Sequence, residues 1–417
     1  MHGAFSPVNI VRTLVSGPTT APQVAEKFTG KNLRIDRDKR ILMCVRTTLQ
    51  YNGFRVAVRS NDLTALAWLK SFLIPSFELD NVTAGDCDVS LQVGLAEHHK
   101  LYQRGPGLSG ARVACFTRDG KPHLHPRWLG RHEEEVIYDE EYEVFYCFSA
   151  KVTAIRIVAA RLAGRSRIAL MRVVRELATS DSLRKGHLPV HGSAFAVGDN
   201  CVIISGPKGA GKSTLLLSAL QGGADGLLAN DRLFVNLGGL RPYARGMPTI
   251  VKIWEDSIRM FPSLVERIKE SMYPDRLTLR GSGRWRYPSA GASGRLRYLW
   301  TPAQLCDLLG ARPRGEAPLS AIVFPTIVPE RSPTLRLEPL SQEVSARKLL
   351  DGLVRPSVEP AVGLYATGGA SNFPDQDQLA TACESLVSRV KCFECQMGPA
   401  GIRDPASVGL FLSRLLA

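Results

Sequence analysis

Residues 202–221, VIISGPKGAGKSTLLLSALQ, decide the fold of this chain because they join a strand pattern to a helix pattern through a glycine-rich turn. The apolar run 201–204 predicts a buried strand, and the leucines within 215–220 predict a helix. The turn between them has the spacing G-x-x-x-x-G-K-[ST] of a phosphate-binding loop. Its defining residues are Gly206, Gly211, Lys212 and Ser213. A strand, a loop and a helix in this order predict a site for a nucleoside triphosphate.

The loop is expected to hold ATP mainly through its backbone. Glycines let successive N–H groups point at phosphate oxygens, and the N-terminus of the following helix adds a partial positive charge. Lys212 would reach the β- and γ-phosphates, and the Ser213 hydroxyl would bind Mg²⁺. The predicted ATP-binding residues are Gly206, Pro207, Lys208, Gly209, Ala210, Gly211, Lys212, Ser213 and Thr214.

Length and composition bound the class of protein. At 417 residues the chain exceeds a single core, and 44% hydrophobic with 22% charged residues is typical of a globular protein. No apolar stretch approaches the roughly 18 residues that a membrane span needs, and no secretory signal is evident, so we expect a cytoplasmic protein without a membrane span. The net charge of +14 suggests an anionic partner, which ATP or a nucleic acid would satisfy.

Outside the loop, short apolar runs alternate with helical patterns. Residues 54–60, 87–95 and 141–149 read as strands and 63–73 as a helix, whereas 151–178 reads as one long helix. The last part of the chain reads as a helix over 378–390, a strand over 391–398 and a helix over 407–417. These patterns predict an α/β fold.

An ATP-binding cassette also carries this kind of loop, but the rest of the chain does not fit that class. Such proteins need an LSGGQ-like signature and an apolar strand that ends in Asp-Glu, and the strand predicted over 319–327 has no acid at its end. The candidate acid is Asp231, which follows the apolar run 227–229. If these two strands lie side by side in parallel, Asp231 reaches the loop and binds Mg²⁺ directly or through water. The alternative for Asp231 is a turn residue after a buried strand.

Residues 188–235 resemble the core of the HPr kinase/phosphorylase family. Members show a His-Gly pair, a strand hairpin, the phosphate loop, a helix that ends in Gly, and an acidic pair after an apolar strand. The corresponding residues here are His191-Gly192, Gly206 to Thr214, Gly223 and Asn230-Asp231. A looser likeness continues to the C-terminus.

The resemblance implies an enzyme that moves the γ-phosphoryl group of ATP to a serine hydroxyl. In the family the first acid of the pair is the base and the His assists it, which implies that Asp231, His191, Lys212 and Asn230 form the catalytic site. This sequence departs from the pattern because Asn230 cannot accept a proton at neutral pH. Either Asn230 orients the acceptor while Asp231 or His191 takes the proton, or Asp231 alone binds Mg²⁺ and acts as the base.

We therefore expect a Mg²⁺- and ATP-dependent kinase that acts on a hydroxyl of a protein, a peptide or a small metabolite. Residues 39–184 would form an N-terminal α/β domain, and 185–417 a P-loop kinase domain of the HPr-kinase type with a helix-strand-helix extension. Residues 1–38 read as a mobile or extended arm. Two alternatives stay open: an ATP-binding module without transfer activity, and a P-loop NTPase that acts with nucleic acid, a partner we do not expect. The sequence leaves a homo-oligomer open as well.

Overall fold

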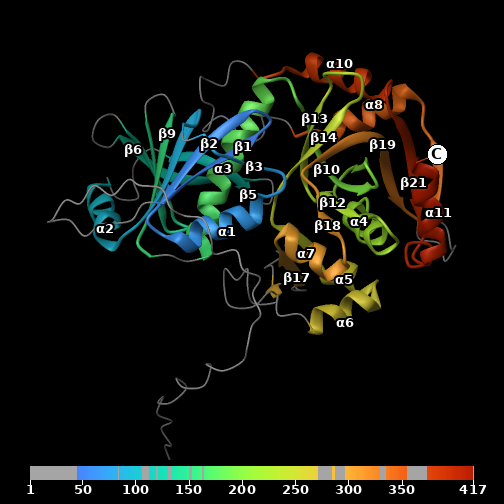
Figure 1. Cartoon of the computed structure of the whole chain (residues 1–417), viewed down its shortest axis with the longest axis horizontal. Coiled ribbons are helices and arrows are strands. Elements are labelled where there is room, and N and C mark those ends of the chain that lie inside the picture. Colours follow the sequence, from blue (N-terminus) through green and yellow to red (C-terminus); the bar gives the residue numbers. More distant parts are fainter. Residues whose placement is uncertain are drawn as a thin grey trace, which may run out of the picture. The chain divides into compact units, whose positions relative to one another are not determined.

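Two large sheets organise the part of the chain that the structure, a computed structural model, describes (Figure 1). In the first sheet the strand order is β3-β1-β2-β4-β9-β8-β7-β6-β5, and in the second it is β18-β12-β10-β13-β14-β19-β21-β20, with β11 paired to β10 and β19. A small third sheet has the order β15-β17-β16. The mixed α/β fold is thus confirmed. The described residues are 45–82, 84–105, 112–118, 121–129, 134–149, 153–161, 164–270, 284–286, 296–328, 335–354 and 373–416.

The first sheet carries the N-terminal part. Its strands are β1 (Val45–Tyr51), β2 (Phe54–Ser60), β3 (Glu78–Asp80), β4 (Cys87–Val93), β5 (Arg112–Arg118), β6 (Lys121–Leu129), β7 (Glu135–Asp139), β8 (Val144–Phe148) and β9 (Ala154–Ala159). Its helices are α1 (Leu63–Leu73), α2 (Leu95–Arg104) and α3 (Gly164–Arg184). The strands predicted over 54–60, 87–95 and 141–149 and the helix over 63–73 are confirmed as β2, β4, β8 and α1, although β4 ends at Val93 and Leu95 begins α2.

The single helix predicted over 151–178 is wrong at its beginning. Residues Ala154–Ala159 form strand β9, which pairs with β4 and β8, and the helix begins only at Gly164. The β-branched residues Ile155, Ile157 and Val158 favour a strand, and pairing on both edges decides the outcome.

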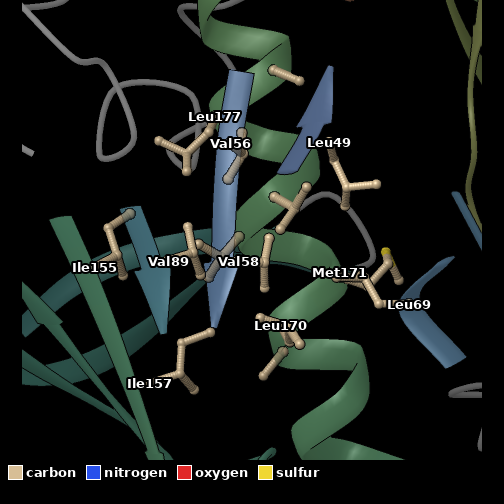
Figure 2. Packing of buried hydrophobic residues seen from close by; sticks show 14 of the residues in the cluster. Leu49, Val56, Val58, Leu69, Val89, Ile155, Ile157, Leu170, Met171 and Leu177 are labelled. Atoms are coloured by element: carbon tan, nitrogen blue, oxygen red, sulfur yellow. The ribbon is translucent and has the colours of Figure 1, made fainter. Parts of the chain in front are cut away.

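Helix α3 packs across the first sheet, and a hydrophobic core lies between the helix and the strands (Figure 2). Leu170, Met171 and Leu177 of the helix lie against aliphatic side chains that the strands present (Figure 2). The strand residues labelled there are Leu49, Val56, Val58, Val89, Ile155 and Ile157. α3 is buried along most of its length, including several polar residues, so it is a central helix with neighbours on more than one side.

The second sheet carries the phosphate loop. Its strands are β10 (Leu188–Val197), β11 (Asn200–Ser205), β12 (Gly226–Ala229), β13 (Arg232–Asn236), β14 (Tyr243–Met247), β18 (Arg312–Pro313), β19 (Glu316–Ile327), β20 (Leu335–Pro339) and β21 (Lys391–Met397). The helices are α4 (Lys212–Gln221), α5 (Glu255–Arg259), α6 (Pro262–Glu270), α7 (Pro302–Leu309), α8 (Gln342–Asp351), α10 (Gln376–Val387) and α11 (Pro405–Leu416). The small sheet is formed by β15 (Val251–Trp254), β16 (Arg284–Arg286) and β17 (Leu296–Trp300).

The unbroken apolar run before the loop is explained by packing on both faces of β11. Val202 and Ile204 belong to a core with α4 and α11, whereas Cys201 and Ile203 belong to a core with α8 and α10. Successive side chains of a strand point to opposite faces, so a strand covered on both sides is apolar throughout. The final helix, strand and helix predicted at the C-terminus are confirmed as α10, β21 and α11.

The predicted side-by-side position of the two strands that precede the loop and Asp231 is wrong. β12 pairs antiparallel with β10, with Ala194 opposite Ala229, and β11 also pairs antiparallel with β10, with Gly192 opposite Ser205. The same residues of β10 pair with β11 along one edge and with β12 along the other, so β10 lies between these two strands. The two strands still run in the same direction, and both end near the first half of β10.

Residues Met43–Ala417 form one compact unit. The boundary predicted between residues 184 and 185 stays a prediction, and the arm predicted over 1–38 lies outside the described residues. Across the described ranges, no helix combines the length and the apolar character that a membrane crossing requires.

Candidate active site

The phosphate loop has the backbone shape that its glycines allow. Gly206, Gly209 and Gly211 have φ angles of 152°, 90° and 99°, a region that L side chains rarely adopt. Gly211 is also the N-cap of α4, and a Cβ on it would clash with the Cε atom of Met397. The predicted order of strand, loop and helix is therefore confirmed, and the positive φ at the start of the helix favours glycine there.

The predicted ATP-binding residues lie together at the start of α4. Gly206 and Thr214 are buried, Ala210, Gly211, Lys212 and Ser213 are half-buried, and Pro207, Lys208 and Gly209 are exposed. The Lys212 ammonium donates to Gly206 O at 2.6 Å and to Pro207 O at 3.1 Å, so it lies over the first half of the loop. Burial lowers the pKa of Lys212, and the charge of Asp231 opposes this shift. Lys212 and Asp231 are thus electrostatic neighbours.

His191 and Asp231 face each other across two paired strands. Nδ1 of His191 lies 3.6 Å from Oδ1 of Asp231, and the two side chains are 45% and 50% exposed. Their backbones are fixed because β10 pairs with β13 and the Gly192 N–H donates to Asp231 O at 3.0 Å. The pair is open to solvent on one side, which leaves room for a reactant.

The glycine after His191 has a physical reason. A Cβ on Gly192 would lie 2.6 Å from Ile204 O, because β10 and β11 approach closely there. The His-Gly pair therefore places a half-exposed imidazole at the point where β10 meets the strand that feeds the loop.

Asn230 is held by hydrogen bonds to both its side chain and its backbone. The Thr249 hydroxyl donates to Asn230 Oδ1 at 3.0 Å, and the Ser193 hydroxyl donates to Asn230 O at 3.1 Å. The amide NH₂ group keeps two N–H donors, and Oδ1 keeps a second lone pair. Asn230 is thus held in place beside Asp231 with N–H groups that can donate to a reactant.

Arg232, the residue after Asp231, is not on the surface. It is 7% exposed, and its guanidinium lies 3.4 Å from Glu176 of α3, which is also buried. The neighbouring Arg175 is buried as well, and burial lowers its pKa to about 10 against the raising effect of Glu176 and Asp231. Arg232 therefore does not face solvent, and α3 contributes buried charges next to the residue that follows Asp231.

A pocket of about 470 Å³ adjoins the loop, and we name it the loop-side pocket. Three segments line it: the loop residues Gly206, Pro207, Gly209 and Ala210, the end of β19 from Phe324 to Ile327, and the end of α8 with Lys348, Asp351 and Gly352. Gly352 O accepts a hydrogen bond from the His191 N–H at 2.9 Å. A Cβ on Gly352 would clash with Ser205 Oγ, so α8 ends in direct contact with the strand before the loop.

A larger cleft of about 870 Å³ lies at the other end of β11. Asn200, Arg389 and Lys391 are among its lining residues, whereas the phosphate loop does not contribute to it. Of these two cavities, the loop-side pocket is the one that the phosphate loop lines, and the side chains of Lys212 and His191 are not among its lining residues.

The sequence did not indicate Glu176, Thr249, Lys348 or Asp351. Each lies far along the chain from the loop and belongs to a stretch without a motif, and folding alone brings them to it. The signal that was available for Lys348 and Asp351 is the helical pattern over 342–351, which ends in Asp-Gly and thus places polar groups at a helix C-terminus.

Comparisons with known proteins give only slight likeness, and it comes from solved structures. No protein-family model matches the chain, and no curated protein matches it. Among solved structures, the chain is similar to the HPr(Ser) kinase/phosphatase from Coxiella burnetii, with 10% identity and a TM-score of 0.25, over 55% of this chain and 97% of that chain. A likeness of this degree does not establish a shared fold, and the chemistry of the site rests on its own residues.

Proposed function

We propose that this protein is an ATP-dependent phosphotransferase that moves the γ-phosphoryl group of ATP to a hydroxyl group. The observation that carries the proposal is the meeting of three features at one place. Lys212 lies over the first carbonyls of the phosphate loop. Gly192 joins the loop to Asp231, because it pairs with Ser205 and its N–H donates to Asp231 O. Asp231 in turn faces His191 at 3.6 Å. A phosphate-binding loop next to a proton-accepting pair is the arrangement that transfer to a hydroxyl requires.

The residues of the site fit ATP and Mg²⁺. The loop has glycines at positive φ, which allow successive backbone N–H groups to point at phosphate oxygens. Ser213 and Asp231 supply oxygen donors, which Mg²⁺ prefers, and Mg²⁺ commonly takes few protein ligands and completes its shell with phosphates and water. When bound, ATP supplies the phosphoryl group and Mg²⁺ neutralises its charge.

The protein's own residues would perform the remaining steps. Lys212 would leave the Gly206 and Pro207 carbonyls and pair with the β- and γ-phosphates. Asn230, fixed by Thr249, would donate a hydrogen bond that orients the acceptor. Asp231, with His191, would accept the hydroxyl proton as the acceptor oxygen bonds to phosphorus and the bond to the ADP oxygen breaks. Because the transition state is loose, orientation and charge matter more here than a strong base.

The test follows label from the γ-phosphate of ATP. The full chain is incubated with Mg²⁺, γ-labelled ATP and a host extract that is separated into macromolecular and small-molecule fractions, beside the Lys212→Ala variant. We expect label that depends on Lys212 in one of the two fractions, and the fraction tells whether the acceptor is a macromolecule or a metabolite. ATP binding with no turnover would overturn the proposal in favour of an ATP-binding module. Label in free phosphate that rises with added DNA or RNA would favour a nucleic-acid-dependent NTPase.

A further inference from the structure

The loop-side pocket is connected to both halves of the candidate chemistry. On the donor side, Gly206 and Pro207 line it, and the same two residues hold the Lys212 ammonium through their carbonyls. Since a phosphate-loop lysine reaches the β- and γ-phosphates, the end of ATP that reacts lies at this wall. On the other side, Gly352 lines the pocket and accepts the hydrogen bond of His191 N–H. A compound in the pocket would thus lie against the phosphate loop, and one backbone hydrogen bond joins the opposite wall to the strand that carries His191.

The size and walls of the pocket suit a small organic group. Its volume of about 470 Å³ is within the range of roughly 300–1,000 Å³ that is usual for ligand sites. Phe324, Pro325 and Ile327 give it an apolar wall, and the loop gives it a backbone wall. Apolar walls with a few polar groups are the usual composition of such a site, in which the polar groups set orientation and specificity.

The two charged side chains that line the pocket, Lys348 and Asp351, differ in their ion pairing. The Lys348 ammonium lies 3.1 Å from Glu394 Oε1, and the Thr326 hydroxyl donates to the same oxygen at 3.2 Å. This cation is therefore neutralised within the protein. Asp351, by contrast, forms no ion pair with any residue that the structure describes, and its side chain is exposed.

The end of α8 strengthens the negative character of this wall. Asp351 is the last residue of the helix, and the C-terminus of a helix carries a partial negative charge. A free carboxylate at that end attracts a cation and repels an anion. An acceptor with a phosphate or carboxylate near its hydroxyl would meet like charge here.

We propose that the loop-side pocket is the acceptor site, and that Asp351 selects hydroxyl compounds that carry a protonated amine or a guanidinium. This inference rests on the proposed function, since an acceptor site requires that a phosphoryl group is transferred at the loop. Two sources have this chemistry: a serine with a basic neighbour in a peptide, and a small amino alcohol. In both, the hydroxyl points toward Lys212 and His191 while the cation pairs with Asp351.

The first part of the test measures binding, which does not depend on turnover. The full chain is saturated with Mg²⁺ and a non-hydrolysable ATP analogue and titrated by calorimetry with serine peptides of equal length whose neighbouring residue is Arg, Gln or Glu. Ethanolamine and ethylene glycol form the small-molecule pair. We expect the cationic member of at least one set to bind about tenfold more tightly than its neutral partner, as a charged hydrogen bond in a pocket would give. Equal binding of the cationic and neutral members in both sets would overturn the inference.

The second part uses variants and transfer rates. Asp351→Asn should remove the preference for the cation and leave ATP affinity unchanged, Asp351→Lys should reverse it, and Asp377→Asn on α10 is the matched control. A lower kcat for every acceptor in Asp351→Asn, with the charge preference intact, would make Asp351 a proton acceptor and contradict the inference. If the cationic compounds bind in an Asp351-dependent way but no label is transferred, the proposed function fails while the pocket assignment stands.

Discussion

The donor side and the acceptor side of the candidate site are built in different ways. The donor side is one continuous stretch, Gly206 to Thr214, whose shape follows from its own glycines. The acceptor side is assembled from β10, the turn before β13, and the end of α8, which are joined by strand pairing and by backbone hydrogen bonds such as His191 N–H to Gly352 O. The difference teaches that the shape of the phosphate loop is a local property of this chain, whereas the acceptor side depends on the whole fold.

The largest expected effect is the loss of ATP turnover on substitution of Lys212, which belongs to the donor side. Lys212→Ala removes the ammonium that would pair with the β- and γ-phosphates, and we expect ATP turnover to fall on the order of 100- to 1,000-fold, as when one preorganised charge donor is lost. The fold should persist, because the lysine packs on carbonyls and not in a core. Steady-state ATP turnover measures this, with Lys269→Ala on the exposed face of α6 as the control. Turnover within twofold of the wild type would remove Lys212 from the site.

The next largest effect is expected from breaking the buried ion pair between Glu176 and Arg232, next to Asp231. Glu176→Gln leaves the buried Arg232 without its carboxylate, and breaking a buried pair costs about 3 kcal/mol or more of the free energy of unfolding. Because Arg232 follows Asp231 directly, transfer should fall while ATP affinity is retained. Urea unfolding followed by circular dichroism gives the first quantity, and Glu266→Gln, an exposed pair with Lys269, is the control with a change below about 1 kcal/mol. Equal stability of the two variants would show that the pair behind Asp231 is not stabilising.

The third prediction concerns the pH dependence of ATP affinity, which tests the donor side through Lys212. Burial lowers the pKa of Lys212 below its ordinary 10.5, so the ammonium loses its proton earlier than a free lysine as pH rises. Only the charged form pairs with phosphate, so ATP affinity should be full below that pKa and should fall, by up to about tenfold per pH unit, as pH rises through it. Calorimetric titration with Mg²⁺-ATP across the alkaline range measures the midpoint. A midpoint above 10.5 would mean that Asp231 outweighs burial.

The smallest effect concerns the residue that departs from the family pattern. Asn230→Asp adds a second proton acceptor without changing size, and we expect transfer to rise a few-fold at most, since a loose transition state asks little of a base. The Thr249 hydroxyl can still donate to the new carboxylate, so the local structure should persist. Transfer is compared at equal ATP saturation with Asp199→Asn, in an exposed turn, as the control. A rise of several orders of magnitude would show that Asn230 limits the proton step.

The sequence was sufficient for the donor side because every constraint there is local. The glycine spacing, the apolar strand and the helix pattern lie within twenty residues, and each is confirmed. The acceptor side was predicted only in part: His191 and Asp231 were named, but the approach of Asp231 to the loop was attributed to adjacent parallel strands, and β10 in fact lies between those strands. Thr249 and Asp351 reach the site through long-range pairing and packing that no local pattern contains.

The central claim is that binding of ATP and transfer of its phosphoryl group are separate tasks of Lys212 and Asp231. The most direct test is a single-turnover experiment with γ-labelled ATP and the acceptor-bearing extract fraction, run on the wild type and on Asp231→Asn at saturating Mg²⁺-ATP. The account predicts that the variant binds ATP with an affinity within tenfold of the wild type but transfers label on the order of 100- to 10,000-fold more slowly. Transfer at the wild-type rate by Asp231→Asn would contradict the account.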